Sequence, residues 1–366
     1  MTPEVKNVRG LRFAVAENVA ITPLAFSSSS GSVRGGLTGS NLPDFSLQFR
    51  GDGRGGVRAT TRFRHDDSSG KFAPAEYREV NATGLYLGPL HREFGHFLTE
   101  SSSRMWFCGQ DLESWDSMLF LPETSDEGDR GAWRTNGPYG WRRDALEFLG
   151  VDEAHYVVDP IRIRRLIIPE QGNYLFSPHM HDLQKEFLSR NAAEKLGGYK
   201  PTRRVFFSRE NFHGGRNGYK SVLGESYLSQ FLAEYGYENV IPESLSLTEQ
   251  IELAYETKFA IGVQGSAFHI FNLLGSTDVH ALVIQRQSWA TTRGFLQSLE
   301  PAVGKIVNIS GSVEFPEGNF QGLILPDVQQ FLTELAEFDQ EVDISQFSWS
   351  TFYETVRGEI SKRGVV

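Results

Sequence analysis

The sequence contains a single cysteine, Cys108, among 366 residues. No intramolecular disulfide can therefore form, which favours a reducing compartment. No stretch approaches the roughly 20 apolar residues of a membrane-spanning helix. Residues 1–20 also lack the uninterrupted apolar segment of a secretory leader. We therefore expect a cytoplasmic protein without a transmembrane segment, and peripheral association with a membrane stays compatible with this expectation.

Positive charge is also scarce. The chain has 36 Lys and Arg against 46 Asp and Glu, which gives a formal net charge of −10 at pH 7. This balance argues against the broad basic face that binds nucleic acid, so no nucleic-acid partner is expected. A few local arginines can nevertheless hold the phosphates of a nucleotide. The length suits two domains, and the 39% hydrophobic and 22% charged residues are ordinary for a globular protein.

Two common phosphate-binding motifs are missing or lack their context. No GxxxxGK[ST] segment occurs, and the glycine-rich stretch 50–56 precedes a strand-like segment rather than a helix. Cys108 has little support as a nucleophile, because nothing near it in the sequence would lower its pKa. Any ligand site must therefore be sought in the strand and helix pattern.

Residues 1–75 resemble short strands separated by polar loops, and strands alternate with helices from about residue 84. In the second half, strands are expected at 203–209, 239–241, 258–263 and 279–285, with helices between them. This alternation predicts an α/β fold with a parallel sheet covered on both faces. Three parts are expected: an N-terminal domain with a β-rich beginning (1–165), a C-terminal Rossmann-like domain (166–337) and a helical tail that returns to the N-terminal domain (338–366).

The segment KFAIGVQGSAFHIFNLL (258–274) is the most informative. An apolar strand ends at Val263, Gln264 and Gly265 form a turn, and a helix is expected from Ser266. Phosphates bind well where a parallel strand meets a helix N-terminus, because free amides and the helix dipole point there. A plain tight turn with a capping serine is the alternative. Beyond it, His269 and Asn272 lie near one helical face, where they could meet a ligand or satisfy buried backbone.

Polar residues follow other strands of the second half. Ser208 and Arg209 end the strand at 203–209, and Arg209 and Arg216 are the best candidates for phosphate contacts, because a guanidinium can hold two phosphate oxygens. A surface salt bridge is the alternative, especially for Arg216. Glu249 completes a capping box with Ser246, which accounts for it structurally, and a ribose-binding role is the second possibility.

A helix is expected over residues 92–106 of the first half. His96, Glu100, Ser103 and Arg104 fall on one side of it, away from its apolar stripe. A histidine and a glutamate one turn apart can act as a base and its orienting partner, or bind a sugar acceptor. A solvated polar face is the alternative. Half of a metal site is a weaker possibility, because no third ligand is evident, and no metal is expected.

Four segments in this order resemble glycosyltransferase family 61. They are GHFLTESSSRMW (95–106), FSR (207–209), the "PE-x-LS-x-x-EQ" segment (242–250) and the strand, GSA and helix that end at Leu274. The family includes bacterial proteins assigned to capsular polysaccharide biosynthesis, and plant and animal xylosyl-, arabinosyl- and N-acetylglucosaminyltransferases. The chain departs from the family's usual pattern at Gln264, where histidine is frequent, and at Gly224-Glu225, where Asn-Glu is frequent.

The resemblance implies a GT-B fold, in which two Rossmann-like domains face each other across a cleft. It further implies a nucleotide-sugar donor on the C-terminal domain, expected to be a UDP-sugar, with inversion at the anomeric carbon and no obligatory metal or other cofactor. His96, Glu100 and Arg104 would face the cleft from the N-terminal, acceptor-side domain. The residues placed around the donor are Ser208, Arg209, Glu249, Gly265, Ser266, Ala267, His269 and Asn272.

These observations predict an inverting glycosyltransferase that acts on a glycan hydroxyl, in capsular or other surface polysaccharide synthesis. His96 or Glu100 would take the proton of the acceptor hydroxyl. Arg209 and the helix end at Gly265 and Ser266 would stabilise the departing phosphate. Two alternatives stay open: a non-catalytic protein that binds nucleotide sugars or glycans, and a nucleotide-sugar epimerase on a similar scaffold.

Overall fold

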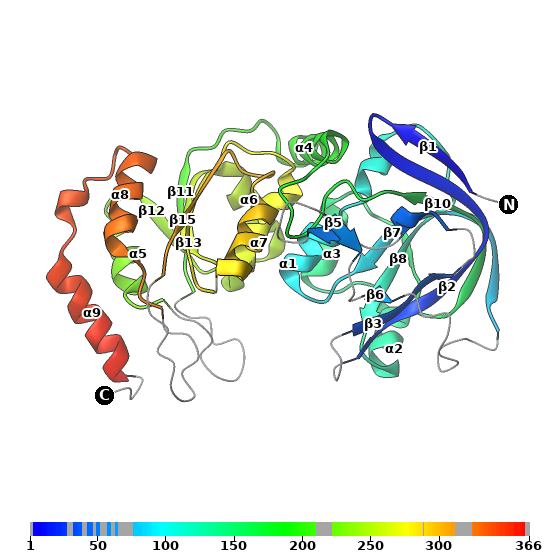
Figure 1. Ribbon diagram of the computed structural model, residues 1–366, viewed down its shortest axis with the longest axis horizontal. Coiled ribbons are helices and arrows are strands. Elements are labelled where there is room, and N and C mark those ends of the chain that lie inside the picture. Colours follow the sequence, from blue (N-terminus) through cyan, green and yellow to red (C-terminus); the bar gives the residue numbers. More distant parts are fainter. Residues whose placement is uncertain are drawn as a thin grey trace. The chain divides into compact units, whose positions relative to one another are not determined.

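The computed structural model describes most of the chain, in two compact units (Figure 1). Unit 1 comprises Met1–Lys195 with Asn272–Gly275, and unit 2 comprises Leu196–Phe271 with Ser276–Val366. Among the described residues we find no helix whose length and hydrophobicity would let it span a bilayer. The described residues are 3–27, 32–38, 42–46, 49–51, 57–59, 63–64, 76–209, 222–287, 289–311 and 324–362.

Unit 1 is built on a mixed sheet. Its strand order is β6-β3-β2-β10-β7-β8-β9, and β1 pairs with β2. The neighbours β10, β7, β8 and β9 are parallel, whereas β2 runs antiparallel to β10. The long strand β2 also pairs with β8, so the strand order closes on itself. The bounds are β1 (Glu4–Val8), β2 (Leu11–Ser27), β3 (Ser32–Thr38), β6 (Phe63–Arg64), β7 (Arg78–Leu90), β8 (Ser117–Thr124), β9 (Ala154–Tyr156) and β10 (Ile161–Pro169).

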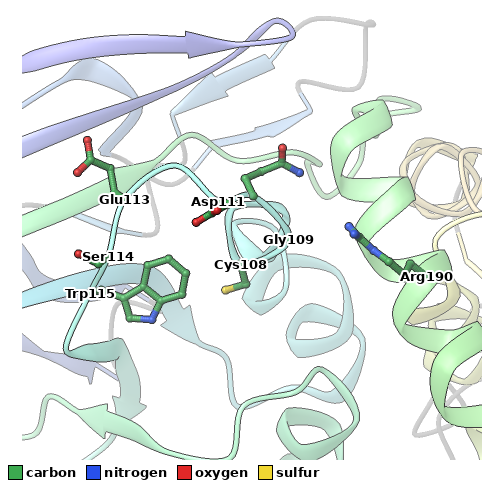
Figure 2. A pocket seen from close by; sticks show the side chains of 8 residues that line it. Cys108, Gly109, Asp111, Glu113, Ser114, Trp115 and Arg190 are labelled. Atoms are coloured by element: carbon green, nitrogen blue, oxygen red, sulfur yellow. The ribbon is translucent and has the colours of Figure 1, made fainter.

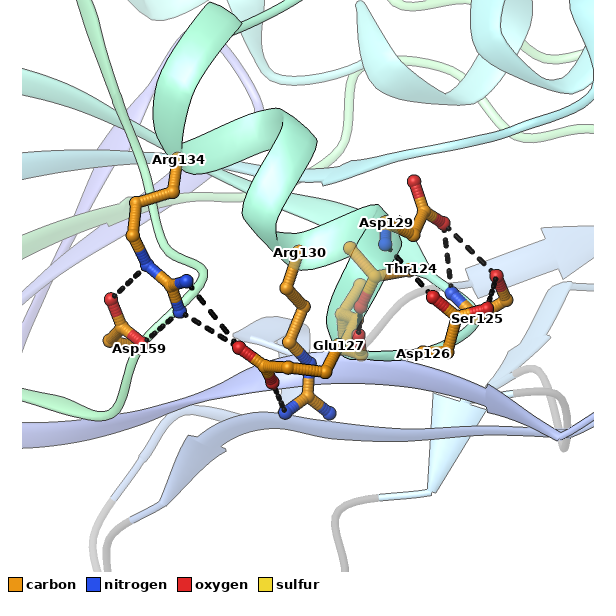
Figure 3. Close-up of polar contacts among 9 residues, drawn as sticks. Thr124, Ser125, Asp126, Glu127, Asp129, Arg130, Arg134 and Asp159 are labelled. Carbon is orange, nitrogen blue, oxygen red and sulfur yellow. Dashed lines mark hydrogen bonds and ion pairs between the residues drawn. The ribbon is translucent and has the colours of Figure 1, made fainter.

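Two helices connect β8 to β9, namely α2 (Glu127–Asn136) and α3 (Trp141–Phe148). Asp126 begins α2 as its N-cap, because its carboxylate accepts the amide of Asp129 at 2.9 Å. At the other end of α2, Arg134 donates to Asp159 at 2.6 Å and also reaches Glu127 (Figure 3). These polar contacts fix the helix against the loop that follows β9.

The boundary between the units differs from the one predicted at residue 165. α4 (Asp182–Leu196) belongs to unit 1. The Gln184 side chain is fully buried. It donates to the carbonyl of Ser102 at 2.9 Å and accepts a hydrogen bond from the amide of Trp106 at 3.0 Å. The helix is therefore bonded into unit 1, and the chain leaves that unit only after it.

Unit 2 contains a five-stranded parallel sheet, which confirms the four parallel strands predicted for the second half and adds a fifth, residues 305–309, that was not predicted. The strand order is β12-β11-β13-β14-β15. Numbered along the chain this is 2-1-3-4-5, a doubly wound order whose direction reverses between β11 and β13, and ligands bind at such a reversal. The bounds are β11 (Arg203–Phe207), β12 (Tyr237–Val240), β13 (Thr257–Val263), β14 (His280–Ile284) and β15 (Lys305–Ile309).

The C-terminal tail packs within unit 2, so its predicted return to the N-terminal domain is wrong. Phe352 of α9 (Trp349–Lys362) lies in one hydrophobic core with Phe231 of α5 (Glu225–Ala233) and Phe331 of α8 (Val328–Phe338). Glu359 accepts the amide of Gly224 at 2.9 Å. A β-carbon on Gly224, whose φ is +76°, would lie 2.2 Å from the Phe352 ring, so the apolar face of α9 is closely fitted to the start of α5.

Asp339, at the end of α8, is expected to make unit 2 sensitive to acid. Burial raises the pKa of Asp339. Hydrogen bonds from Arg204, the Glu341 amide and Tyr237 together lower it by more than burial raises it, so the pKa is below its ordinary value. Because the pKa of Asp339 is lower in the folded state, its charge stabilises the fold at pH values above the unfolded-state pKa of about 3.9. This stabilisation is lost as the pH falls through the folded-state pKa. Asp339→Asn is expected to cost about 2 kcal/mol at neutral pH.

Urea unfolding at about pH 7 and about pH 3 measures this effect. The difference between the native chain and Asp339→Asn should shrink at the lower pH, where the native carboxyl is itself becoming protonated. The control is Asp278→Asn, since Asp278 is an exposed aspartate of the same unit. An equal loss of stability at both pH values would contradict the assigned role of the Asp339 charge.

Candidate functional site

The predicted strand and turn at 258–265 are present at the carboxyl end of β13. The amide of Gln264 donates to the carbonyl of Ile284 at 2.9 Å, which extends the pairing with β14 by one residue. The next element, η5 (Ser266–Leu274), is a 3₁₀ helix rather than an α-helix. Ser266 at its start is exposed and Ala267 is half-buried. The turn residues Gln264 and Gly265 are themselves buried, so exposure at this edge of the parallel sheet begins at Ser266.

Two arginines from the flanking strands contact this turn. Arg209 follows β11, and its Nη1 atom lies 2.8 Å from the position that a β-carbon on Gly265 would take. Arg286 follows β14, and its Nε donates to the carbonyl of Gln264 at 2.6 Å. Because β13 lies between β11 and β14, the two guanidinium groups reach the same turn from either side.

The electrostatics of this turn favour an anion. Burial lowers the pKa of Arg209. Burial and the positive charge of Arg209 lower the pKa of Arg286 to about 10, so both groups are still charged at neutral pH. Two like charges beside one turn repel each other, and an anion bound between them removes that cost. A diphosphate suits the arrangement, because each guanidinium can donate two charge-assisted hydrogen bonds to it.

Gln264, where histidine is frequent in the family that the sequence resembles, has a structural role. Its side-chain oxygen accepts the amide of Arg286 at 3.2 Å and the hydroxyl of Thr292 at 3.0 Å. These bonds hold the segment that leads from β14 into α7 (Trp289–Leu299). Gln264 therefore positions Arg286. Sequence analysis did not select Arg286, although it follows a buried strand within two residues, as Arg209 does.

Ser208 and Glu225 orient the backbone that carries Arg209. The Ser208 hydroxyl donates to a carboxylate oxygen of Glu225 at 3.0 Å, and the amide of Arg209 donates to the same oxygen. Both side chains are buried. Glu225 lies in the first turn of α5, where a negative charge is favourable. Ser208, predicted to lie at the donor, therefore directs its hydroxyl to Glu225.

The other residues predicted around the donor have different surroundings. Glu249 completes the capping box with Ser246, as expected, and its role toward the donor stays a prediction. His269 is buried and its ring lies 5.1 Å from that of Phe295, edge to face. Asn272 is grouped with unit 1, where its amide reaches the Thr99 hydroxyl at 3.5 Å. Arg216 lies outside the described residues.

The helix predicted over 92–106 is interrupted. It consists of α1 (Phe94–His96), a π-helical turn η2 (Phe97–Ser101) and a 3₁₀ turn η3 (Met105–Gly109). The serines explain the interruption, because Ser102 and Ser103 donate through their hydroxyls to the carbonyls of Leu98 and Glu100 at 3.1 and 2.7 Å. Single π-helical turns occur frequently at functional sites.

The predicted contact between His96 and Glu100 is confirmed. His96 Nδ1 and Glu100 Oε2 are 2.7 Å apart, within hydrogen-bonding distance. The side chain of Glu100 is 0% exposed and that of His96 is 26% exposed. The alternative of a solvated polar face is therefore wrong for Glu100. An imidazole that orients a buried carboxylate is suited to proton transfer.

Arg104, from the same predicted helix face, is also buried, and its side chain donates hydrogen bonds to backbone carbonyls. Its Nε donates to the carbonyl of Pro169 at 2.9 Å and an Nη group donates to that of Phe45 at 3.2 Å. Burial lowers its pKa. The guanidinium thus links η3 to β10, and its predicted contact with substrate stays a prediction.

The sequence did not indicate two further members of the Glu100 cluster, namely His91, which contacts Glu100, and Glu123, which contacts His91. Leu90 of β7 pairs with Pro122 of β8, so the next residues, His91 and Glu123, come side by side. His91 Nε2 lies 3.6 Å from Glu100 Oε2, and His91 Nδ1 lies 3.6 Å from Glu123 Oε2. All three side chains are buried. His91 therefore supplies the third possible metal ligand that the sequence did not show.

A separate surface cavity of about 550 Å³ lies between η3 and α4 in unit 1 (Figure 2). Its lining includes Trp115, Glu113 and Arg190, and Glu113 is already paired with Lys6 at 2.8 Å. Burial raises the pKa of the Cys108 thiol, also in the lining, to about 12. The thiol is therefore protonated at neutral pH, in agreement with the expectation that it is no nucleophile.

Comparison with known proteins assigns a family. The family model "Glycosyltransferase 61" matches residues 94–273. This range contains the His96–Glu100 pair, Arg209 and the Gly265 turn, whereas His91 and Arg286 lie outside it. Comparison with the curated proteins gives no match. Through residues 94–273 the chain belongs to glycosyltransferase family 61, whose members transfer a sugar from a donor to an acceptor.

Proposed function

We propose that the chain is an inverting glycosyltransferase that moves a sugar from a nucleotide-sugar donor, a UDP-sugar, to a hydroxyl group of a glycan. The observation that carries the proposal is the pair Arg209 and Arg286 at the Gly265 turn. The GT-B arrangement implied by the resemblance is part of the proposal. So are a role in capsular or other surface polysaccharide synthesis and a cytoplasmic location.

Unit 2 would hold the donor through its diphosphate. The turn at Gly265 follows a strand beside the reversal point of the parallel sheet, the usual ligand position in such folds. Because Gly265 has no side chain, the Arg209 guanidinium lies against the turn, where it can meet a phosphate. Arg209 and Arg286 add two positive charges at the same turn. Together these groups suit two linked phosphates better than one.

The proposed reaction is a single displacement. Glu100, oriented by His96, accepts the proton of the acceptor hydroxyl while that oxygen bonds to the anomeric carbon. The bond from the anomeric carbon to the diphosphate oxygen breaks, and its electron pair stays on the departing nucleoside diphosphate. Arg209 and Arg286 stabilise the added negative charge, without an obligatory metal ion at the leaving group. One displacement inverts the anomeric configuration.

A panel of nucleotide sugars tests the proposal. The melting temperature of the full chain is measured with UDP-, GDP-, dTDP- and CMP-sugars. We expect stabilisation by diphosphate donors, strongest for a UDP-sugar and weakest for the monophosphate CMP-sugars. A ligand at 100 times its Kd stabilises by about 2.7 kcal/mol. Nucleotide release is then measured with and without glycan acceptors.

The outcomes separate the proposal from its rivals. Release of nucleotide that depends on the acceptor supports a transferase. Stabilisation without turnover indicates a protein that only binds nucleotide sugars, and isomerisation of the sugar indicates an epimerase. If no nucleotide sugar stabilises the chain, the assignment of the Gly265 turn to a diphosphate is wrong.

A further inference from the structure

We propose that His91, His96 and Glu100 form a binding site for a divalent transition-metal ion, Zn²⁺ being the best fit. Each of the three side chains offers one ligand atom, and the three atoms lie within 4.8 Å of one another. Binding at this site is independent of the proposed function. Its consequence for catalysis, described below, rests on that function.

The distances in the cluster are close to those of a zinc site. With metal–ligand bonds of about 2.0–2.1 Å, ligand atoms in a tetrahedral site are about 3.4 Å apart. His96 Nδ1 and Glu100 Oε2 are 2.7 Å apart, and His91 Nε2 and Glu100 Oε2 are 3.6 Å apart. These values lie on either side of the ideal one, and the third pair, formed by ligand atoms of His91 and His96, is within 4.8 Å, so small side-chain adjustments give a coordinating arrangement.

The backbone holds the ligands from two directions. His91 directly follows β7, and its amide donates to the Ser101 hydroxyl at 3.2 Å. His96 and Glu100 lie one turn apart across the junction of α1 and the π-helical turn η2. A site whose ligands are fixed by a strand end and a helical turn loses little side-chain freedom when an ion binds.

The chemistry of the donor set favours zinc. Two imidazoles and one carboxylate are a common zinc ligand set that leaves a fourth position open. His96 retains some exposure, which gives solvent and a metal ion access to the cluster. Hard cations such as Mg²⁺ prefer all-oxygen ligands, so they are poorer candidates.

Glu123 supplies the outer support that metal-binding histidines usually have. Its carboxylate faces His91 Nδ1 at 3.6 Å, which leaves Nε2 directed to Glu100. A carboxylate behind a histidine fixes the ring orientation and raises its basicity as a ligand. A second possible group, His91 with Glu93 and Glu123, is less suitable because Glu93 is exposed and only one imidazole contributes.

A metal ion in this site would compete with the proposed chemistry. Coordination uses the Glu100 lone pair that would accept the acceptor's proton, and it takes His96 Nδ1 away from its contact with Glu100. Zn²⁺ is therefore expected to inhibit sugar transfer.

Metal titration of the full chain, first dialysed against a chelator, tests the site. Zn²⁺ affinity is measured by competition with a chromogenic chelator, and Co²⁺ is added to detect the visible absorption of a tetrahedral site. We expect one tightly bound ion per chain. His91→Gln and His96→Gln are each expected to lower the affinity at least about 100-fold, and Glu123→Gln about 10- to 100-fold.

His155→Gln is the matched control, because His155 lies in the same unit and contacts Arg78 rather than the cluster. It is expected to leave the affinity unchanged. Should the buried His91→Gln variant fail to fold, the partly exposed His96 decides the outcome. Zn²⁺ affinity that is the same in His96→Gln as in the native chain overturns the proposal.

The transfer assay distinguishes failure of the site from failure of the proposed function. If Zn²⁺ binds through these residues and transfer is uninhibited, the metal site stands and Glu100 is not the proton acceptor. If no ion binds, the metal site is wrong and the proposed transferase activity is unaffected.

Discussion

Glu100→Gln is expected to slow sugar transfer about 100- to 10,000-fold, the range that general base catalysis contributes. Glutamine keeps the shape of the side chain and can still bond to His96, but it cannot accept the proton of an acceptor hydroxyl. Nucleotide binding, which we assign to unit 2, should be unchanged. The measurement is the acceptor-dependent release of nucleotide at saturating donor, together with the Kd for the nucleoside diphosphate.

Glu113→Gln is the control for this variant. Glu113 is a carboxylate of the same unit, and its ion-pair partners are Lys6 and Arg165 rather than any residue of the Glu100 cluster. Its replacement should leave transfer unchanged. Full activity in both Glu100→Gln and His96→Ala would remove this helical turn from the chemistry. Activity that is lost only in His96→Ala would make the histidine the proton acceptor.

The strand-and-turn part of the candidate site was predictable because it is local. The apolar run that ends at Val263, followed by Gln264 and Gly265, specifies a buried strand and a turn without reference to the rest of the chain. The contact between His96 and Glu100 is local too, since residues four apart meet on one side of a helical turn. Spacing in the sequence is sufficient information for such contacts.

Arg286 has the same local position after a strand as Arg209, but its contact with the turn, like the contact of His91 with Glu123, depends on which strands are neighbours. Arg286 reaches Gln264 only because β14 pairs with β13. His91 meets Glu123 only because β7 pairs with β8. The order of strands in a sheet follows from packing of the whole domain, and a single sequence contains no direct signal for it.

The helical errors have a related cause. Residues 92–106 have helical periodicity, but the hydroxyls of Ser102 and Ser103 bond to helix carbonyls and end the α-helix early. The hydrophobic pattern of the tail 338–366 predicts an apolar helix face, but it does not indicate which domain that face packs against. The close fit of Phe352 to Gly224 decides in favour of unit 2, and only the three-dimensional structure contains that fit.

Arg286→Gln is expected to weaken nucleoside diphosphate binding about 10- to 100-fold, because a hydrogen bond to a charged group contributes about 1.5–3 kcal/mol. With Arg209→Gln added, the loss should reach about 1,000-fold or more. Binding of the uncharged nucleoside should change little, since it presents no phosphate to either arginine. Calorimetric titration of each variant with UDP and with uridine measures both effects.

Arg203→Gln separates a local effect on phosphate binding from a general loss of positive charge in unit 2. Arg203 begins β11, the strand that Arg209 follows, but it is paired with Glu238 and Glu256. Its replacement should leave UDP affinity unchanged. Arg286→Lys should give an intermediate affinity, because lysine keeps the charge and loses the two-pronged geometry of the guanidinium. If Arg286→Gln and Arg203→Gln bind UDP equally well, the two arginines at the Gly265 turn do not hold a diphosphate, and the donor must be sought elsewhere in the protein.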